Sequence, residues 1–480
     1  MRKLLLLFML LVFNFFCFGK VIFVNSQAKG ANNGISWSNA YTNLEVALTN
    51  AQRDDTLWVA KGIYTPGDKT DREASFKIYN VTFFGGFAGT ENTLSQRNYI
   101  LNETVLNGNI GEQDDATDNC YSVVELVGGT LDGVIVTNGY GNNSNGYKIR
   151  KGGGIEVTGS PTIRNCVFYN NYSENGGAVG YEDQLPRFEN CKFISNSAKQ
   201  GGAVFQKSAF NGIFPNFVGC LFNNNTAEEG GAIYSWKAHV GATNCTFVNN
   251  SNCLYIYDYN KQCDVEFLNT IFYNNGEDDS FGASFSISGS NHTREWTYCL
   301  VPPAFEFPDY NVFTYKNIND NPGFVNPDGK DGIPGTVDDD YRLSSDSPAR
   351  NTGKSSLGRF YELDFDFYGN LRVYEELINI GAFETYDLTG NTEIAKCNIK
   401  IFPNPTNELI HINLGATYNE VTVDIRNMNG RSISNQFYEQ ATIIEQKIAG
   451  APGIYFITVY EKGKKLASVK TLKIDDQNTE

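Results

Sequence analysis

Hydrophobic and polar residues recur in two short patterns through the middle of the chain. The first reads Asn-Cys-x-Phe-x-x-Asn with variations, at residues 165–171, 190–196, 219–225, 244–250 and 269–275. In the second, paired glycines precede a small residue and a branched apolar residue, at 152–155, 176–179, 201–204 and 230–233. Each pattern returns after about 25 residues. Two strand-like pieces held in phase over such a period predict the coils of a parallel β-helix.

The residues inside each pattern predict how the coils stack. Cysteine and phenylalanine in the first pattern lie two residues apart, so both side chains share one face of a strand, which we expect to be the inside. Cys should then lie on Cys and Phe on Phe, about 4.8 Å apart in adjacent coils. The asparagine three positions after each phenylalanine falls at a corner, where its amide can bond to the next asparagine. A β-propeller is excluded, because its blades repeat every ~40–50 residues.

Two segments near the N-terminus predict export and a cap. Residues 1–19 begin with Arg2 and Lys3, continue as an apolar run and end at Gly19, which is the pattern of a signal peptide. No later segment approaches the ~18 apolar residues of a membrane span, so we expect no transmembrane segment. Residues 42–52 combine a Thr42–Glu45 capping-box pattern with apolar residues at helical spacing. They predict an amphipathic helix that covers the N-terminal end of the β-helix.

Composition narrows the class of protein. The chain has 480 residues with 47 Gly, 14% aromatic residues and only 19% charged residues, which excludes a coiled coil and a disordered acidic tail. Frequent Gly disfavours long helices, and aromatic residues favour strands. The net charge of −16 makes nucleic acid and anionic membrane surfaces unsuitable partners. The expected fold class is therefore all-β.

The repeats resemble those of secreted right-handed parallel β-helix proteins in the pectin-lyase-like superfamily, and their GGA[IV] and FxxN motifs are similar to those of chlamydial polymorphic outer-membrane proteins. Further segments resemble a variant common in Bacteroidetes surface proteins: IFVNSQAKGANNGISWSNAYTNLEVAL at 22–48, FFGGFAGTE at 83–91, YRLSSDSPARNTG at 341–353 and INIGAFE at 378–384. The resemblance covers most of residues 20–386. It implies the right-handed fold but leaves the activity open, because that group contains adhesins, other surface proteins and polysaccharide enzymes.

The C-terminal part resembles the sorting domain of the type IX secretion system. The matching segments are IFPNPT at 401–406, VTVDIRNMNGR at 421–431, GIYFITV at 453–459 and residues 464–473. Short apolar strands and the Asn429-Gly430 turn predict a small β-sandwich. The resemblance implies that this domain addresses the chain through the periplasm to the outer-membrane translocon and is removed there. The remaining protein is then secreted or held at the cell surface.

These observations predict a linear organisation. A signal peptide at 1–19 precedes a parallel β-helix domain at 20–386, made of an N-terminal cap at 20–52, coils at 53–320 and a C-terminal end at 321–386. A polar linker at 387–392 leads to the sorting domain at 393–480.

One face of the β-helix is the candidate binding surface. The residues that follow each glycine-pair strand should stack there and mix aromatic with polar side chains: Glu182, Asp183, Gln206, Lys207, Trp236, Lys237, His239, Tyr257, Asp258, Tyr259 and Lys261. This mixture suits glycan binding by ring stacking and hydrogen bonds, and it also suits an ordinary solvated surface. Two hypotheses follow: a non-catalytic adhesin or glycan-binding protein, and alternatively a polysaccharide lyase or glycoside hydrolase. Spacing picks out no carboxylate pair and no lysine base, so no catalytic residue is assigned.

An acidic loop and the cysteines are the candidates for metal chemistry. The loop carries five aspartates between glycines: Asp328, Asp331, Asp338, Asp339 and Asp340. Hard oxygen ligands on a flexible loop suit calcium, with a solvated acidic loop as the alternative. Cysteines that come one per coil lack the paired spacing of zinc sites, and we expect them to be buried thiols. Cys253 and Cys263 are candidates for a disulfide across a short loop.

Overall fold

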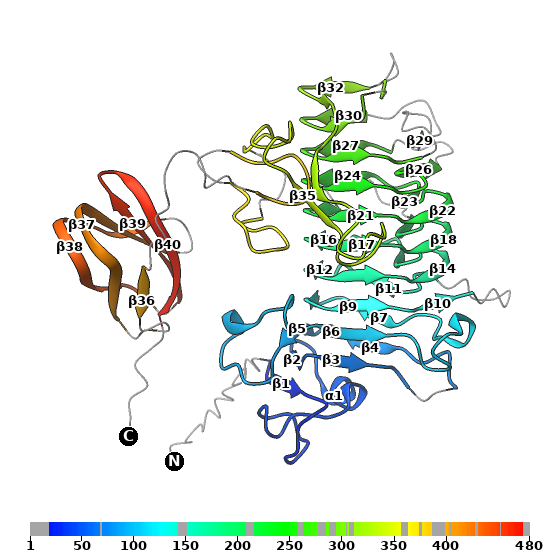
Figure 1. Ribbon diagram of the computed structural model, residues 1–480. Helices are drawn as coiled ribbons and strands as arrows, with labels where there is room; N and C mark the ends of the chain where they lie inside the picture. Colours follow the sequence, from blue (N-terminus) through cyan, green and yellow to red (C-terminus); the bar gives the residue numbers. More distant parts are fainter. Residues whose placement is uncertain are drawn as a thin grey trace, which may run out of the picture. The chain divides into compact units, whose positions relative to one another are not determined.

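The computed structural model describes residues 19–67, 70–142, 151–207, 216–257, 263–276, 285–287, 294–303, 305–306, 312–356, 363–373, 377–385, 399–402, 406, 408–427, 431–451 and 453–473. The chain divides into two compact units, one that ends at Thr385 and one that begins at Tyr386. The first unit is a stack of parallel strands and the second is an antiparallel sheet (Figure 1). The predicted signal peptide up to residue 18 and the predicted linker lie outside the described residues.

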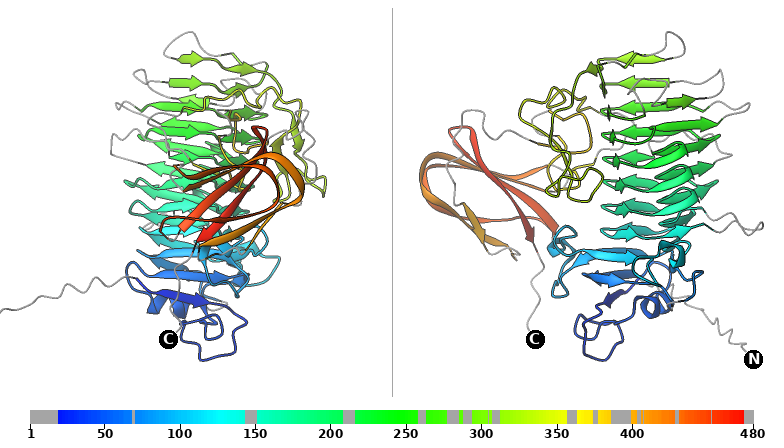
Figure 2. Two further views of the ribbon diagram at one scale, coloured as in Figure 1. Left: turned by 90° about the vertical axis from the view of Figure 1, so that its left-hand side faces the viewer. Right: turned by 45° about the vertical axis from the view of Figure 1, so that its right-hand side comes forward.

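The first unit is a parallel β-solenoid of about 7 turns, which confirms the predicted β-helix. Successive coils stack along one axis, as both views of Figure 2 show. Each regular coil gives one strand to each of three parallel sheets, here named sheets A, B and C, and some coils add a strand to a fourth, sheet D. The sequence patterns predicted only two strands per coil, those of sheets B and C. Sheet A lacks a constant motif, because its inward residue changes from Ile163 to Phe188, Phe217 and Ala242 in successive coils.

The strands have the following bounds within the described residues. Sheet A has 11 strands: β1 Val21–Val24, β2 Thr56–Ala60, β5 Thr82–Phe87, β8 Thr130–Asp132, β12 Thr162–Arg164, β16 Arg187–Glu189, β20 Phe217–Val218, β24 Val240–Thr243, β27 Val265–Leu268, β30 Arg294–Thr297 and β32 Phe313–Tyr315. Sheet B has 10 strands: β3 Gly62–Tyr64, β6 Thr104–Asn107, β9 Ile135–Thr137, β13 Val167–Tyr169, β17 Lys192–Ile194, β21 Leu221–Asn223, β25 Thr246–Val248, β28 Ile271–Tyr273, β31 Leu300–Val301 and β33 Ile318–Asn319. Sheet C has 8 strands: β4 Phe76–Tyr79, β7 Val124–Val127, β11 Ile155–Thr158, β15 Val179–Glu182, β19 Val204–Lys207, β23 Ile233–Trp236, β26 Leu254–Tyr257 and β29 Phe285–Ile287. Sheet D has 4 strands: β10 Tyr140–Gly141, β14 Tyr172–Asn175, β18 Ser197–Gln200 and β22 Thr226–Glu229.

Identical side chains stack in the interior. The ring centroids of one buried column are 4.4–5.2 Å apart, and its members are Phe168, Phe193, Phe222, Phe247 and Phe272. This spacing is close to the ~4.8 Å that separates neighbouring strands. Each coil therefore buries its phenylalanine against the one below, which fixes the register of the stack.

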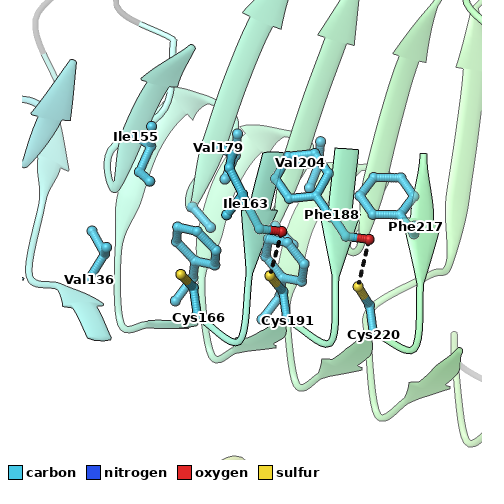
Figure 3. Packing of buried hydrophobic residues seen from close by; sticks show 14 of the residues in the cluster. Val136, Ile155, Ile163, Cys166, Val179, Phe188, Cys191, Val204, Phe217 and Cys220 are labelled. Carbon is cyan, nitrogen blue, oxygen red and sulfur yellow. Dashed lines mark hydrogen bonds between the residues drawn. The ribbon is translucent and has the colours of Figure 1, made fainter. Parts of the chain in front are cut away.

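The cysteines form a second buried column. Cys191 Sγ lies 3.4 Å from the Ile163 carbonyl oxygen, and Cys220 Sγ lies 3.6 Å from that of Phe188 (Figure 3). The thiols are thus weak donors to the backbone of the preceding coil and otherwise act as small apolar groups. Cys253 and Cys263 are buried and are not joined to each other, so the disulfide suggested for them is wrong.

Asparagines hold the corners that follow sheet B. Asn196 is fully buried, its amide nitrogen donates to Asn225 Oδ1 at 3.0 Å, and its Oδ1 accepts from Asn171 Nδ2. The same bond continues from Asn225 to Asn250 and from there to Asn275. The asparagine ladder expected from the repeats is therefore present. It satisfies backbone groups that a buried corner would otherwise leave unpaired.

The N-terminal end of the solenoid is covered by α1, Leu44–Asn50. This confirms a helix within the predicted range, but the predicted capping box between Thr42 and Glu45 is not formed. Asn43 is the N-cap, and its side chain accepts from the Val46 backbone N–H at 3.1 Å. Glu45 does not close a box with Thr42; its carboxylate accepts instead from the Gly67 backbone N–H at 2.9 Å. This longer-range bond ties the helix to the loop before β4, which local pattern alone does not reveal. Short 3-10 helices lie at η1 Leu94–Gln96 and η2 Ala116–Asp118.

After β33, the chain turns back along the solenoid. We call the described residues between 320 and 385 the returning segment. It contains β34 Phe324–Asn326 and β35 Asp340–Leu343, an antiparallel pair, and Figure 1 shows β35 beside the strands of sheet B. Its apolar side chains pack on outward residues of that sheet: Leu221 and Val248 with Tyr341, Phe367 and Phe383, and Ile271 and Leu300 with Leu343 and Ile380. The outer face of sheet B is therefore covered at β21, β25, β28 and β31.

The second unit is an antiparallel sheet of five strands within the described residues: β36 Lys400–Phe402, β37 Leu409–Asn427, β38 Ser432–Lys447, β39 Gly453–Glu461 and β40 Lys464–Lys473. The long strand β37 pairs with β38 along most of its length and with β39 in its second half. A core of its own contains Ile412, Leu414, Val423 and Ile457. This separate core shows that the unit has the packing of a small domain.

Candidate functional site

The outer face of sheet C places several predicted residues in one in-register row. Glu182, Lys207, Trp236 and Tyr257 are the last residues of β15, β19, β23 and β26, and each is paired with the next across the sheet. Parallel neighbours lie about 4.8 Å apart, so their side chains touch. The stacking expected from the repeat is thus the actual arrangement of these four residues.

The aromatic end of this row is accessible. The Trp236 and Tyr257 rings have centroids 5.5 Å apart in an edge-to-face arrangement, and Tyr257 is 40% exposed. The Lys207 ammonium lies 5.2 Å from the centre of the Trp236 ring, a cation–π contact. The arrangement holds two flat apolar surfaces next to a cation, of which Tyr257 is exposed and Trp236 is half-buried.

The charged end of the row is a triad that local sequence did not reveal. Glu182 pairs with Lys207 of the next coil and with Lys151 of the preceding one. Burial, followed by the nearby Lys207 ammonium, lowers the pKa of the Lys151 side chain. Lys151 stands directly before the first glycine pair, so a closer reading of the residues flanking that motif could have included it.

A second row of aromatic rings lies one pleat away on the same face. Phe205, Tyr234 and Tyr255 stack in parallel, with centroids 5.4 and 5.3 Å apart. Phe205 and Tyr234 are buried, whereas Tyr255 is half-buried. Burial raises the pKa of the Tyr234 and Tyr255 hydroxyls, so both rings are neutral. The row gives the accessible aromatic pair a rigid support.

The other candidates of this face have structural roles. Gln206 is buried and accepts from the Tyr181 hydroxyl at 2.6 Å while donating to Ser235 Oγ at 3.0 Å. His239 Nδ1 accepts from the Asp264 backbone N–H at 2.8 Å.

Two more of the predicted residues lie at corners of the coil. Asp183 and Lys237 follow sheet C strands and take positive φ angles of 54° and 55°. The remaining predicted residues, Asp258, Tyr259 and Lys261, lie outside the described residues.

The acidic loop uses its carboxylates internally. Asp338 accepts from the Lys330 backbone N–H at 2.7 Å, Asp339 accepts from the Gly335 N–H at 2.7 Å, and Asp340 pairs with Arg342. Hydrogen bonds from Thr336 and the backbone lower the pKa of Asp338, whereas burial raises that of Asp339.

Asp331 also accepts from a local backbone group, the Ile333 N–H at 2.9 Å, and Asp328 is exposed. Among the described residues, no three His, Cys, Asp or Glu side chains gather as a metal site would require. The structure therefore does not bring the five aspartates together.

Comparison with known proteins identifies the second unit. Residues 400–474 match the family described as the secretion system C-terminal sorting domain. The chain therefore carries a type IX sorting domain, which indicates export and a secreted or cell-surface location. No curated protein matches the chain. In the described part of the chain, no helix has the length and apolarity of a membrane span.

Proposed function

We propose that the exported β-solenoid is a non-catalytic glycan-binding protein of the cell surface or the surrounding medium, and that it binds through the outer face of sheet C. The observation that carries the proposal is the in-register row of Lys207, Trp236 and Tyr257. Flat rings pack against the apolar faces of sugar rings, while fixed charged groups bond to hydroxyls. Both kinds of group lie side by side on this face.

The surroundings of the row support this choice. The returning segment covers sheet B at β21, β25, β28 and β31, so the outward residues of those strands are not open to a ligand. Export by a sorting domain brings the protein into contact with extracellular polymers. The net charge of −16 disfavours nucleic acid as an alternative polymer. The row runs along the stacking direction of the coils, which suits a linear chain rather than a single small molecule.

The test compares two aromatic substitutions with a matched control. Trp236→Ala with Tyr257→Ala removes the accessible pair, whereas Phe313→Ala removes a ring that is 57% exposed on sheet A. Binding of the exported protein is measured on a glycan array and by calorimetry with the polysaccharides that bind. We expect the double variant to lose at least roughly tenfold in affinity and Phe313→Ala to be unchanged. Equal binding by all three proteins would contradict the proposal.

A polysaccharide lyase on the same face is the second candidate, and the half-buried Lys151, whose pKa is lowered by burial, favours it. A base whose pKa approaches the operating pH abstracts a proton more effectively. Incubation with a polysaccharide panel should then create unsaturated ends, and Lys151→Ala should abolish them. Lys199→Ala is the control, because Lys199 is an exposed lysine that also pairs with a glutamate, Glu174. Binding without new ends would exclude this candidate.

A further inference from the structure

The binding face of sheet C is closed at one end by the helix α1. In each later coil a sheet C strand precedes a sheet A strand, but α1 stands at this place in the chain before β2. Within the described residues, β4 is consequently the terminal strand of sheet C, and α1 packs next to it. A polymer lying along the face therefore meets a wall at α1.

A cavity lies at this closed end. Its volume is about 660 Å³, and it is bounded by α1, by described residues of the loop before β4 and by β4 itself. Lys77 and Tyr79 are the β4 residues that line it, whereas Phe76 and Ile78 point into the core and do not. The cavity is therefore on the outer face of the sheet, not at its hydrogen-bonding edge.

The cavity continues the two outward rows of sheet C. Lys77 pairs in register with Glu125, and that row continues to Glu156. The row of Tyr79 is the one that reaches Glu182 and Lys207 in later coils. About five inter-strand steps of ~4.8 Å separate Tyr79 from Trp236, or roughly 24 Å. One extended chain can thus contact the aromatic pair and the cavity together.

The lining of the cavity selects the chemistry of its ligand. Ser75 lines it, but its hydroxyl oxygen is itself buried and is not offered to a ligand in the cavity. The charged side chains around the cavity are therefore the groups that a ligand meets. Three carboxylates, Glu45, Asp71 and Glu73, and only one ammonium group, that of Lys77, line the same cavity. This balance repels a uronate and accepts a ligand rich in hydroxyl groups.

We infer that this cavity is a terminal subsite that holds the uncharged end unit of a polysaccharide chain lying on sheet C. The inference rests on the proposed glycan-binding function and adds to it the end of the chain and the charge of its last unit. The face then binds a free end of the polysaccharide, because α1 blocks the chain from continuing past the cavity.

The first experiment blocks the ends of the ligand. Native full-length protein is titrated with neutral cello-, xylo- and manno-oligosaccharides whose ends are both free, or blocked by a bulky group at one end or at the other. Oligogalacturonates of the same lengths provide the charged comparison. We expect a block at one specific end to weaken binding roughly tenfold, a block at the other end to have little effect, and the oligogalacturonates to bind more weakly. Binding that ignores both blocks, or that favours oligogalacturonates, would overturn the terminal subsite.

The second experiment changes the cavity. Thr49→Trp places a large side chain from α1 into it, and Asn50→Trp places the same side chain one residue further on, where the position does not line the cavity. We expect Thr49→Trp to weaken the binding of short oligosaccharides and Asn50→Trp to leave it unchanged.

The two proposals fail in different ways. If Trp236→Ala weakens binding while Thr49→Trp and the blocked ends have no effect, the terminal subsite is wrong and glycan binding on sheet C remains. If the native protein binds none of the oligosaccharides or polysaccharides, both proposals are wrong.

Discussion

Arg372 fills the space that a side chain at Gly219 would occupy. Gly219 stands where other coils of the first pattern have asparagine, and its φ is +68°. A β-carbon there would collide with Arg372 Nη2, which donates to Asn190 Oδ1 at 3.1 Å. Arg372 Nη1 lies 3.4 Å from Glu384 Oε1, and both residues are buried. The repeat thus loses its asparagine at the coil where the returning segment inserts an arginine.

Gly219→Asn should destabilise the solenoid although it restores the repeat. Asparagine tolerates a positive φ, but the new side chain must displace the buried guanidinium from Asn190. We expect a loss of about 1–3 kcal/mol in the free energy of unfolding, typical of overpacking, measured by urea denaturation. Gly369→Asn is the control, since Gly369 has a φ of +83° and nothing within 4 Å of an added β-carbon. Equal effects of the two substitutions would contradict the steric explanation.

Asn225→Ala should be among the most destabilising single substitutions. The Asn225 amide bonds to Phe193 O and to Asn250 Oδ1, and its Oδ1 accepts from Asn196. Its loss leaves several buried groups unpaired, at about 1–3 kcal/mol each. Thermal and urea unfolding should show the change.

Asn170, which directly precedes the buried ladder residue Asn171, provides the control for this substitution. Asn170 is exposed, with a φ of 55° and one amide bond to Asn138. Because glycine accepts a positive φ, Asn170→Gly should cost less than about 1 kcal/mol. If it cost as much as Asn225→Ala, the buried ladder would not be the reason for the stability of the corner.

Lys192 should make stability depend on alkaline pH. Its side chain is buried under the returning segment, 4.3 Å from the Phe367 ring centre, and burial lowers its pKa to about 8. In the unfolded chain a lysine titrates near ~10.4, so between these values the unfolded state binds more protons. Burial of Lys192 therefore lowers the free energy of unfolding at pH values below about 8, and this penalty disappears as the pH rises to ~10.4.

Lys192→Met tests this dependence. The free energy of unfolding, measured from pH 7 to pH 10, should rise with pH more steeply for the native protein than for the variant. At neutral pH the variant should be at least as stable, because methionine avoids burying a charge. Lys199→Met, at an exposed lysine, should keep the native profile. Parallel profiles for native protein and Lys192→Met would contradict the prediction.

Removal of calcium should leave stability unchanged. Asp338 and Asp339 bond to the loop itself, Asp340 pairs with Arg342, and Asp339 additionally accepts from Asn223 at 2.8 Å. We expect these bonds to hold the loop in place. Differential scanning calorimetry with excess chelator and with added calcium should give the same Tm. A shift of several degrees would show that an ion contributes about 1 kcal/mol or more.

Deletion of residues 400–474 should stop export. These residues form the sorting domain, which has its own core, so its removal should leave the solenoid folded. Fractionation should find the truncated protein in the periplasm and the full chain outside. Substitution of exposed Phe437 by Ser within the same domain tests whether a lesser change suffices. Normal surface display of the truncated protein would contradict the role of the domain.

The repeats determined those parts of the structure that depend on neighbouring coils. The period of about 25 residues and the spacing of two between Cys166 and Phe168 sufficed to predict inward columns and an asparagine ladder, because every coil meets a copy of its own pattern. The row from Glu182 to Tyr257 was predictable for the same reason. Sheet A was not, since its inward positions are apolar without being constant.

The sequence by itself therefore determined the all-β coil, the stacked interior and the address for export, all of which follow from local periodicity and recognisable motifs. Tertiary structure decided which faces remain open. Lys192 lies under Tyr368 and Asn190 bonds to Arg372 through contacts that join residues more than 170 positions apart. Such contacts leave no period in the chain, because the returning segment meets each coil only once. Coverage of the later strands of sheet B follows from this packing.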